Sequence, residues 1–229
     1  MQKVLVMNEY SLPVKRPTKS YLFCKRTLDI VFSLSMIILL LPICLVVALV
    51  AAIDTKGSPL FIQQRMGRNG KPFKMFKFRT MSVNAPANVA TYLLDDADRY
   101  ISKVGGLLRK LSLDELPQLL NILKGDMSFV GPRPVVLSED DLLELRRRNG
   151  AGSVRPGLTG LAQISGRDDV AVGLKAKLDG EYVENMCLVS DMKILFRTVG
   201  DVLTSKGVTD GANPELASTT VDEDERSAS

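Results

Sequence analysis

The chain has 229 residues, of which 45% are hydrophobic and 24% are charged. This is enough for one folded domain with appendages, and the apolar content excludes a fully disordered chain. Histidine is absent, which excludes Ser-His-Asp and Cys-His nucleophile pairs, HExxH zinc sites and imidazole proton shuttles. The three cysteines form no CxxC pair, so the sequence indicates neither a zinc knuckle nor a disulfide framework, and we expect a reducing compartment.

The net charge of +4 is distributed unevenly along the chain. Residues 1–24 form a basic N-terminal tail, and residues 55–81 carry basic side chains but no acidic one. Residues 209–229 are acidic and rich in Ser, Thr and Ala, without apolar periodicity, so we expect a disordered tail there. The two basic blocks flank a single apolar segment.

That apolar segment, residues 30–53, contains no charged side chain. A straight helix of this length would rise about 36 Å, which exceeds the roughly 30 Å of bilayer hydrocarbon and is long enough to span it. Pro42 near its middle would kink such a helix, and basic residues on both flanks favour a cytoplasmic location for both ends. We therefore predict a re-entrant helix-break-helix over residues 25–54, with Ser33, Ser35 or nearby backbone groups forming hydrogen bonds with the backbone that the proline frees. A membrane span, a signal peptide and a buried core helix are the alternatives.

The rest of the chain, residues 55–208, is predicted to form one compact cytosolic domain of the α/β (α+β) class. Residues 59–64 and 72–79 have the composition of strands, and the segment 67–70 between them has that of a turn. In the second strand apolar residues alternate imperfectly with basic ones, which predicts a half-buried basic strand carrying Lys74, Lys77 and Arg79.

Two helices are expected farther along the chain. Residues 113–124 show helical spacing, and residues 181–205 form an amphipathic pattern typical of core or membrane-surface packing. The charge run 146–148 is expected to be a solvated face.

The segment 107–134 carries the residues best suited to chemistry. Residues 112–115 fit a capping box, which would place Asp114 and Glu115 at a helix N-terminus. Neighbouring helical residues point about 100° apart, so the two acids suit divided roles rather than proton sharing. One carboxylate could attack phosphorus while the other holds Mg²⁺. A plain helix cap with an ordinary first-turn acid is the alternative.

Several basic side chains could bind phosphate around this pair. Arg109 and Arg133 could clamp phosphate oxygens bidentately, and the prolines on both sides of Arg133 would hold its backbone in place. Arg155 also lies beside a constrained Gly-rich turn, and Lys77 and Arg79 could face lipid or nucleotide phosphates. Rigid turns and solvated basic faces are the alternatives.

Four sequence motifs resemble those of the bacterial sugar transferases, the small monotopic phosphoglycosyl transferases related to undecaprenyl-phosphate galactose or glucose phosphotransferases. The motifs are KRTLD, FKMFKFRTM, LRKLSLDELPQLLNILKGDMSFVGPRPV and VRPGLTGLAQISGR, and the resemblance covers residues 25–208. The sequence departs from the family at two positions, because Leu41 precedes Pro42 where relatives have serine and Leu161 replaces a common tryptophan.

The resemblance implies a specific reaction. Asp114 would attack the sugar-bearing phosphate of a UDP-sugar, releasing UMP, and polyprenyl phosphate would then take the sugar phosphate from the enzyme. Glu115 would bind Mg²⁺, Arg109 and Arg133 would contact phosphate, and Lys77, Arg79 and Arg155 belong to motifs near the site.

The resemblance further implies location and partners. It places the catalytic domain on the cytoplasmic side of the inner membrane, where the enzyme would prime exopolysaccharide, capsule or glycoconjugate synthesis. The expected partners are the bilayer, downstream glycosyltransferases and a second copy in a homodimer, with no nucleic acid. A non-catalytic membrane scaffold and a Mg²⁺-dependent phosphatase using the same aspartate are the competing hypotheses.

Overall fold

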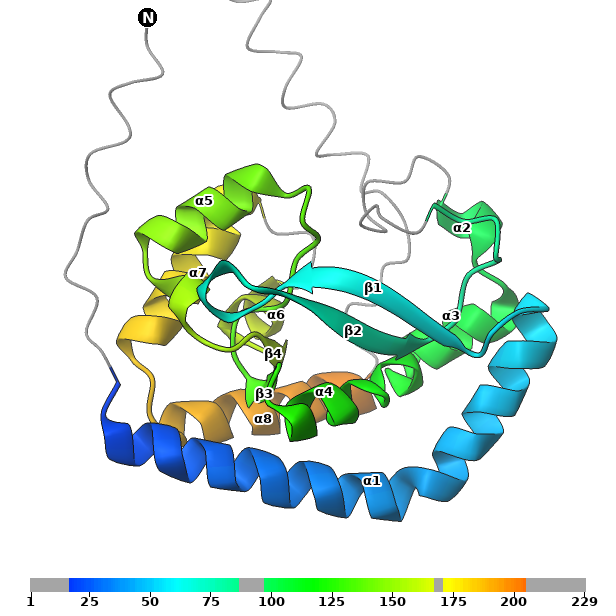
Figure 1. Ribbon diagram of the computed structural model, residues 1–229, viewed down its shortest axis with the longest axis horizontal. Helices are drawn as coiled ribbons and strands as arrows, with labels where there is room; N and C mark the ends of the chain where they lie inside the picture. Colours follow the sequence, from blue (N-terminus) through cyan, green and yellow to red (C-terminus); the bar gives the residue numbers. More distant parts are fainter. Residues whose placement is uncertain (1–16, 87–96, 167–170, 205–229) are drawn as a thin grey trace, which may run out of the picture.

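The computed structural model describes residues 17–86, 97–166 and 171–204 (Figure 1). The acidic segment 209–229 and most of the basic segment 1–24 lie outside the described residues. The described part combines helices with short strands, as predicted for the α/β (α+β) class.

Helix α1 (Lys19–Thr55) is the longest element and contains the whole predicted membrane segment. The side chain of Thr18 caps its N-terminus by accepting a hydrogen bond from the backbone N–H of Tyr21 at 3.3 Å. Its most apolar 18 residues have a mean hydropathy of 3.2. Among the residues that the structure describes, it is the one helix long and apolar enough to cross a membrane.

Figure 1 shows that α1 changes direction part way along and wraps around one side of the molecule. Pro42 lies inside the helix and removes one backbone hydrogen bond, which accounts for a bend. The helical assignment is continuous across Pro42, so the helix is bent rather than interrupted. Ser33 does not stabilise the bend as predicted, because its hydroxyl donates to the carbonyl of Ile30 one turn earlier, at 3.2 Å.

The N-terminal limb of α1, residues 19–41, is attached to the domain by polar contacts. Arg26 donates to the carbonyl oxygens of Ile122 and Leu123 at 2.7 and 2.8 Å. Asp29, only 4% exposed, accepts hydrogen bonds from the Ser128 hydroxyl and the Phe129 N–H, both at 3.1 Å. These are charge-assisted bonds in a buried setting, so they fix this limb firmly.

The C-terminal limb of α1, residues 43–55, packs on the same domain. Val47 and Ala51 are buried, and Val47 belongs to a cluster with Phe78 and Leu108. The Ser102 hydroxyl donates a hydrogen bond to Asp54 at the end of the limb. Both limbs of α1 therefore contact one domain.

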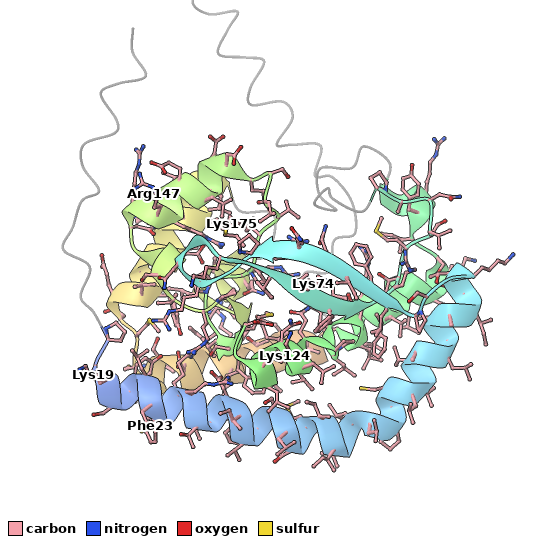
Figure 2. All side chains as sticks on the ribbon, in the orientation of Figure 1. Lys19, Phe23, Lys74, Lys124, Arg147 and Lys175 are labelled. Atoms are coloured by element: carbon pink, nitrogen blue, oxygen red, sulfur yellow. The ribbon has the colours of Figure 1, made fainter. Side chains whose placement is uncertain are left out.

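The outer side of α1 is covered with exposed apolar side chains. Figure 2 shows Phe23 directed away from the domain, and this residue is 74% exposed. Other residues along the helix are also more than half exposed: Val31, Phe32, Ile38, Leu39, Leu41, Leu45, Val46, Leu49 and Ile53. An apolar surface this long marks the helix as a membrane-association surface.

Strands β1 (Leu60–Met66) and β2 (Pro72–Phe78) form an antiparallel hairpin, with Leu60 opposite Phe78 and Met66 opposite Pro72. The predicted turn is confirmed, and Asn69 and Gly70 there have positive φ angles of 57° and 71°. As predicted, β2 is half-buried, because its apolar side faces the domain while Lys74 is exposed (Figure 2).

The predicted helix over residues 113–124 is divided in two. After helices α2 (Ala97–Tyr100) and α3 (Lys103–Lys110), the chain forms a 3₁₀ turn, η3 (Leu113–Glu115), and then helix α4 (Gln118–Lys124). Pro117 occupies the N-cap position of α4, because its missing N–H interrupts the hydrogen-bond pattern of a longer helix.

A second, parallel strand pair lies beside α4. Strand β3 (Ser128–Val130) pairs with β4 (Gly157–Thr159), and Ser128 lies opposite Gly157. A Cβ atom at Gly157 would lie 2.2 Å from the backbone nitrogen of Gly131, so glycine is required at this close approach. Helix α5 (Asp140–Arg148) and the 3₁₀ turn η4 (Ala151–Ser153) connect the strands, and α6 (Leu161–Gly166) follows them.

The predicted helix over residues 181–205 is wrong at its start, because these residues contain the last turn of α7 (Val172–Glu184), a break, and then α8 (Leu188–Leu203). Cys187 begins α8 by accepting a hydrogen bond from the backbone N–H of Ser190 at 3.4 Å. Helix α8 buries Ile194 together with Asp191 and leaves Val189, Phe196 and Val199 more than half exposed, so only part of its apolar side packs in the core, and the predicted membrane-surface packing stays a prediction.

Candidate active site

The two acidic residues lie in the 3₁₀ turn η3, between α3 and α4 and beside β2. The predicted capping box is wrong. Ser112 adopts a left-handed conformation with φ 55° and makes no side-chain cap, while Glu115 is held by basic residues from elsewhere. A non-glycine residue at positive φ is strained, and such positions concentrate at functional sites.

Glu115 is the most strongly bound acid of the site. Its Oε1 accepts from Lys77 Nζ on β2 at 2.8 Å and from Arg133, after β3, at 3.1 Å. Burial by itself would raise the pKa of Glu115, but the charges of Lys77 and Arg133 outweigh burial and lower this pKa to about 2. Glu115 is therefore a permanent anion at neutral pH.

Asp114 is 7% exposed and has the opposite electrostatic balance. Burial raises its pKa to about 6, and the negative charge of Glu115 acts in the same direction. Lys77, Arg109 and Arg133 lower the pKa but do not compensate for burial. Asp114 is thus ionised at neutral pH but weakly stabilised as an anion, which suits a carboxylate nucleophile.

Arg109 is held in place beside this pair by a residue that the sequence pattern did not single out. Its Nε donates to Thr80 Oγ1 at 2.9 Å, and Thr80 is buried at the end of the basic strand motif. The positive charge of Arg109 is one of those that lower the pKa of Asp114. The sequence pointed to Thr80 only through its position directly after Arg79 in the FKMFKFRTM motif.

Arg146 positions Arg133 by a hydrogen bond to its backbone. The guanidinium of Arg146 donates to the Arg133 carbonyl oxygen at 2.8 Å and pairs with Asp179 of α7 at 2.6 Å. Arg146 is 6% exposed, so the prediction that it belongs to a solvated face is wrong. Its partner Asp179 lies on a different helix, so the charge run of α5 gave no indication of this buried pair.

Asn121 of α4 is a second residue that sequence reasoning missed. Its side chain is fully buried, accepts from the Phe76 N–H at 3.0 Å and donates to the Lys74 carbonyl at 2.7 Å. These bonds join α4 to the edge of β2, next to Lys77. The amide therefore fixes the distance between the strand that supplies Lys77 and the turn that supplies the acids.

The remaining predicted phosphate ligands make their contacts elsewhere. Arg79 donates to the Ser58 carbonyl at 3.0 Å and lies over the ring of Phe61. Arg155 donates to the Gly125 carbonyl at 2.9 Å, at the end of α4. The structure thus gathers Asp114, Glu115, Lys77, Arg109 and Arg133, and it places Arg79 and Arg155 outside this group.

The acidic side chains of the site are compatible with a magnesium ion. In the part of the chain that the structure describes, no group of three or more Cys, Asp or Glu side chains could enclose a metal ion. Mg²⁺ needs only one or two carboxylates when substrate phosphates supply further oxygens. Glu115 supplies one such carboxylate, so the donor set fits a magnesium ion held by Glu115 and substrate phosphate oxygens.

Comparisons with known proteins identify the family of this chain. Residues 20–205 match the bacterial sugar transferase family. The chain is 42% identical over 198 residues to the exopolysaccharide production protein ExoY of Sinorhizobium fredii, covering 80% of this chain and 87% of that protein. It is 39% identical over 188 residues to the UDP-glucose:undecaprenyl-phosphate glucose-1-phosphate transferase of Caulobacter vibrioides, covering 79% of this chain and 70% of that protein.

Some relatives are much longer than this chain. The UDP-galactose-lipid carrier transferase of Erwinia amylovora is 41% identical over 205 residues, which are 81% of this chain but 41% of the Erwinia protein. The family match over residues 20–205 includes nearly all of α1, both strand pairs and the turn that carries Asp114 and Glu115. The chain therefore belongs to the bacterial sugar transferase family.

Proposed function

We propose that this membrane-associated sugar transferase moves a sugar 1-phosphate from a UDP-sugar to undecaprenyl phosphate and releases UMP. The observation that carries the proposal is the pairing of a buried aspartate, whose pKa is raised to about 6, with a glutamate fixed by two cations. The name of the Caulobacter vibrioides relative, which includes UDP-glucose and undecaprenyl phosphate, supports this choice of substrates.

The first step is attack by a carboxylate oxygen of Asp114 on the phosphorus that bears the sugar. A new bond forms between this oxygen and phosphorus, and the bond from phosphorus to the UMP oxygen breaks, so UMP leaves with the electron pair. Arg109 and Arg133 would bind the phosphate oxygens as charge shifts toward the leaving group. The product is an acyl phosphate between Asp114 and the sugar phosphate.

In the second step a phosphate oxygen of undecaprenyl phosphate attacks the same phosphorus. The bond to Asp114 breaks, the carboxylate is regenerated, and the diphosphate-linked sugar leaves. Because the carboxylate of Asp114 is poorly stabilised by its surroundings, the covalent state is favoured relative to a solvated aspartate. This is the chemical use of burying the nucleophile.

Glu115 would hold Mg²⁺ together with substrate phosphate oxygens. When bound, the ion would neutralise phosphate charge and so favour departure of UMP. Lys77 and Arg133 orient Glu115 through Oε1. These two contacts hold the Glu115 carboxylate in one orientation.

The position of α1 supports a re-entrant anchor in the cytoplasmic membrane. Both limbs contact the same domain, through Arg26 and Asp29 on one side of Pro42 and through Val47 and Asp54 on the other. In this topology both ends of α1 and the whole catalytic domain are cytoplasmic, where UDP-sugars are available. The product would prime exopolysaccharide or capsule synthesis.

The test measures UMP release from UDP-sugars by the full chain in bilayers containing undecaprenyl phosphate and Mg²⁺. We expect lipid-linked sugar diphosphate as the second product, and at least a 1,000-fold loss in Asp114→Asn, on the order found when a nucleophile is removed. Asp141→Asn, an exposed aspartate of α5, is the matched control. Free sugar phosphate formed without lipid would indicate a phosphatase instead, and undiminished turnover in Asp114→Asn would exclude Asp114 as nucleophile.

A further inference from the structure

Helix α3 carries Arg109 in its last turn and begins beside the end of the membrane helix α1. Asp54 lies in the last turn of α1, and its carboxylate accepts a hydrogen bond from the Ser102 hydroxyl. Ser102 is the N-cap of α3, and its side-chain oxygen also accepts from the Gly105 N–H at 2.8 Å. The side chain that caps α3 therefore also attaches this helix to α1.

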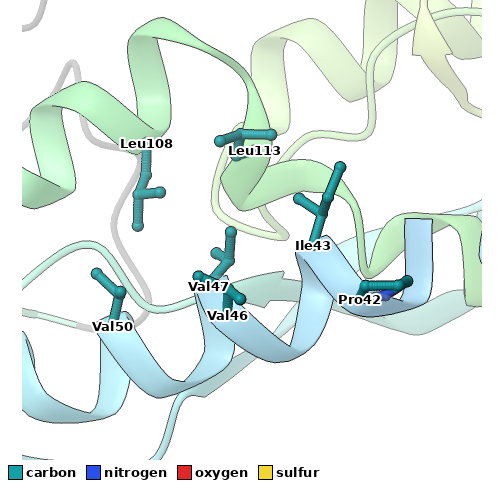
Figure 3. Close-up of a pocket in the computed structure, with 7 residues that line it drawn as sticks. All are labelled: Pro42, Ile43, Val46, Val47, Val50, Leu108 and Leu113. Carbon is teal, nitrogen blue, oxygen red and sulfur yellow. The ribbon is translucent and has the colours of Figure 1, made fainter.

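An apolar contact holds α3 against α1 at a second point. Leu108 of α3 is 7% exposed and belongs to the same core cluster as Val47 of α1. Figure 3 shows Leu108 pointing from α3 toward Val47 and Val50, and the three side chains line one pocket between the two helices. Together with the hydrogen bond to Asp54, this packing fixes the position of α3 relative to the C-terminal limb of α1.

The segment that follows β2 holds α3 from another direction. Gly105 is buried, and a Cβ atom there would lie 2.2 Å from the Thr80 carbonyl oxygen, so only glycine allows this close approach. One turn later, Arg109 Nε donates to Thr80 Oγ1 at 2.9 Å. The Ser82 N–H donates to the Tyr100 carbonyl at 2.8 Å, just before α3 begins. Thr80 thus contacts α3 through its backbone and Arg109 through its side chain.

The position of α3 bears directly on the candidate site. Helix α3 contacts the turn η3 that carries Asp114, and the positive charge of Arg109 is one of those that lower the pKa of Asp114. A shift of α3 therefore moves a cation of the site relative to the acids. A displacement of about 1 Å in a group that acts on the reacting atoms can slow a reaction about 100-fold.

We propose that Asp54, Ser102 and Gly105 are positioning residues that place Arg109 for the phosphate of the UDP-sugar, so that the membrane helix takes part in forming the active site. The inference rests on the proposed function, in which Arg109 binds this phosphate, and it adds the residues that hold the guanidinium in place. None of the three positioning residues touches the substrate. Each acts through Arg109.

The first test compares Asp54→Ala with Asp54→Asn in the full chain in bilayers, by single-turnover UMP release without lipid acceptor. Alanine removes the acceptor of the Ser102 hydroxyl, whereas the side-chain oxygen of asparagine can still accept this hydrogen bond. We expect the maximal rate to fall about tenfold in Asp54→Ala and to stay within threefold of the unaltered enzyme in Asp54→Asn. Equal rates in the two variants would overturn the role assigned to Asp54.

The second test compares Gly105→Ala with Gly106→Ala in the same assay. Both substitutions place alanine in α3, but the nearest atom to a Cβ at Gly106 belongs to Ile101, at 4.0 Å. Alanine at position 105 meets the Thr80 oxygen, and relieving this contact needs a shift of about 1 Å. We expect at least a tenfold lower rate in Gly105→Ala and a rate within twofold of the unaltered enzyme in Gly106→Ala. Equal rates in the two variants would contradict the role assigned to Gly105.

A double-mutant cycle separates positioning from a general effect on folding. Arg109→Met alone should lower the rate of UMP release about 100-fold. If Asp54 and Gly105 act through Arg109, adding Asp54→Ala or Gly105→Ala to Arg109→Met should lower this rate less than twofold further. A further tenfold loss in the double variants would show that these residues act on folding, and it would overturn the inference. Absence of UMP release from the unaltered enzyme would instead contradict the proposed function, so the two failures are distinguishable.

Discussion

The raised pKa of Asp114 predicts how the rate of UMP release changes with pH. In the proposed mechanism the attacking group is the carboxylate of Asp114, so protonation below a pKa of about 6 would remove the nucleophile. With this pKa, roughly 90% of the enzyme is reactive at pH 7 and about 10% at pH 5. Glu115, with its pKa lowered to about 2, stays ionised throughout this range. The rate should therefore fall about tenfold between pH 7 and pH 5.

The assay is single-turnover UMP release without lipid acceptor, at saturating UDP-sugar and constant Mg²⁺. This design matters because the terminal phosphate of undecaprenyl phosphate itself titrates near neutral pH, whereas both phosphates of a UDP-sugar are esterified. Thermal melting at pH 5 serves as the control that the protein remains folded. A rate that stays constant down to pH 5 would refute the assignment of the raised pKa to the nucleophile.

A substitution in strand β2 tests independently whether cations lower the pKa of Asp114. Lys77 is the strongest of the charges that lower the pKa of Asp114. Lys77→Met should therefore move the midpoint of the pH profile upward, toward neutral pH. Lys74→Met alters an exposed lysine of the same strand and should leave the midpoint unchanged. An equal shift in both variants would contradict the electrostatic argument.

Three further predictions concern stability and metal dependence. Asp114→Asn should raise Tm at pH 7, because the folded state disfavours the charged aspartate, and each kcal/mol relieved corresponds to about 2–4 °C; a lower Tm would contradict this. Glu115→Gln should cut UMP release about 100-fold and raise the Mg²⁺ concentration needed for half-maximal rate, which a magnesium titration measures. Arg146→Met should destabilise the domain by about 3–5 kcal/mol in denaturant unfolding, because it removes one partner of a buried ion pair with Asp179.

Local sequence patterns predicted much of the fold. The alternation in residues 72–79 and the turn before it correctly indicated the hairpin, because both depend on neighbours in the chain. The two helix predictions failed at interruptions. Pro117 and Cys187 are the N-caps of α4 and α8, so a helix begins at each of them, although the apolar spacing continues through both regions. Periodicity indicates which face is buried but does not locate every break.

The candidate site was predictable to the extent that its residues lie close in sequence. The sequence allowed Asp114 and Glu115 to be recognised as a pair. It did not allow their opposite pKa shifts to be predicted, because these shifts depend on burial and on cations from β2 and the loop after β3. The role of Arg146 depends on Asp179, more than thirty positions away. Contacts at such separations are set by packing and leave no local signature.

The contacts of α1 have a consequence for attempts to obtain the enzyme without detergent. Near its start, Tyr21 donates to Asp191 at 2.8 Å and Lys25 pairs with the same carboxylate at 2.6 Å, while Val47 completes a core cluster farther along. A chain shortened to begin after Thr55 would lose these partners together, leaving Asp191 without the Lys25 cation and an apolar gap beside the turn that carries Asp114. Membrane anchor and enzyme are thus one folding unit, and solubilising changes belong on the outer surface of the helix.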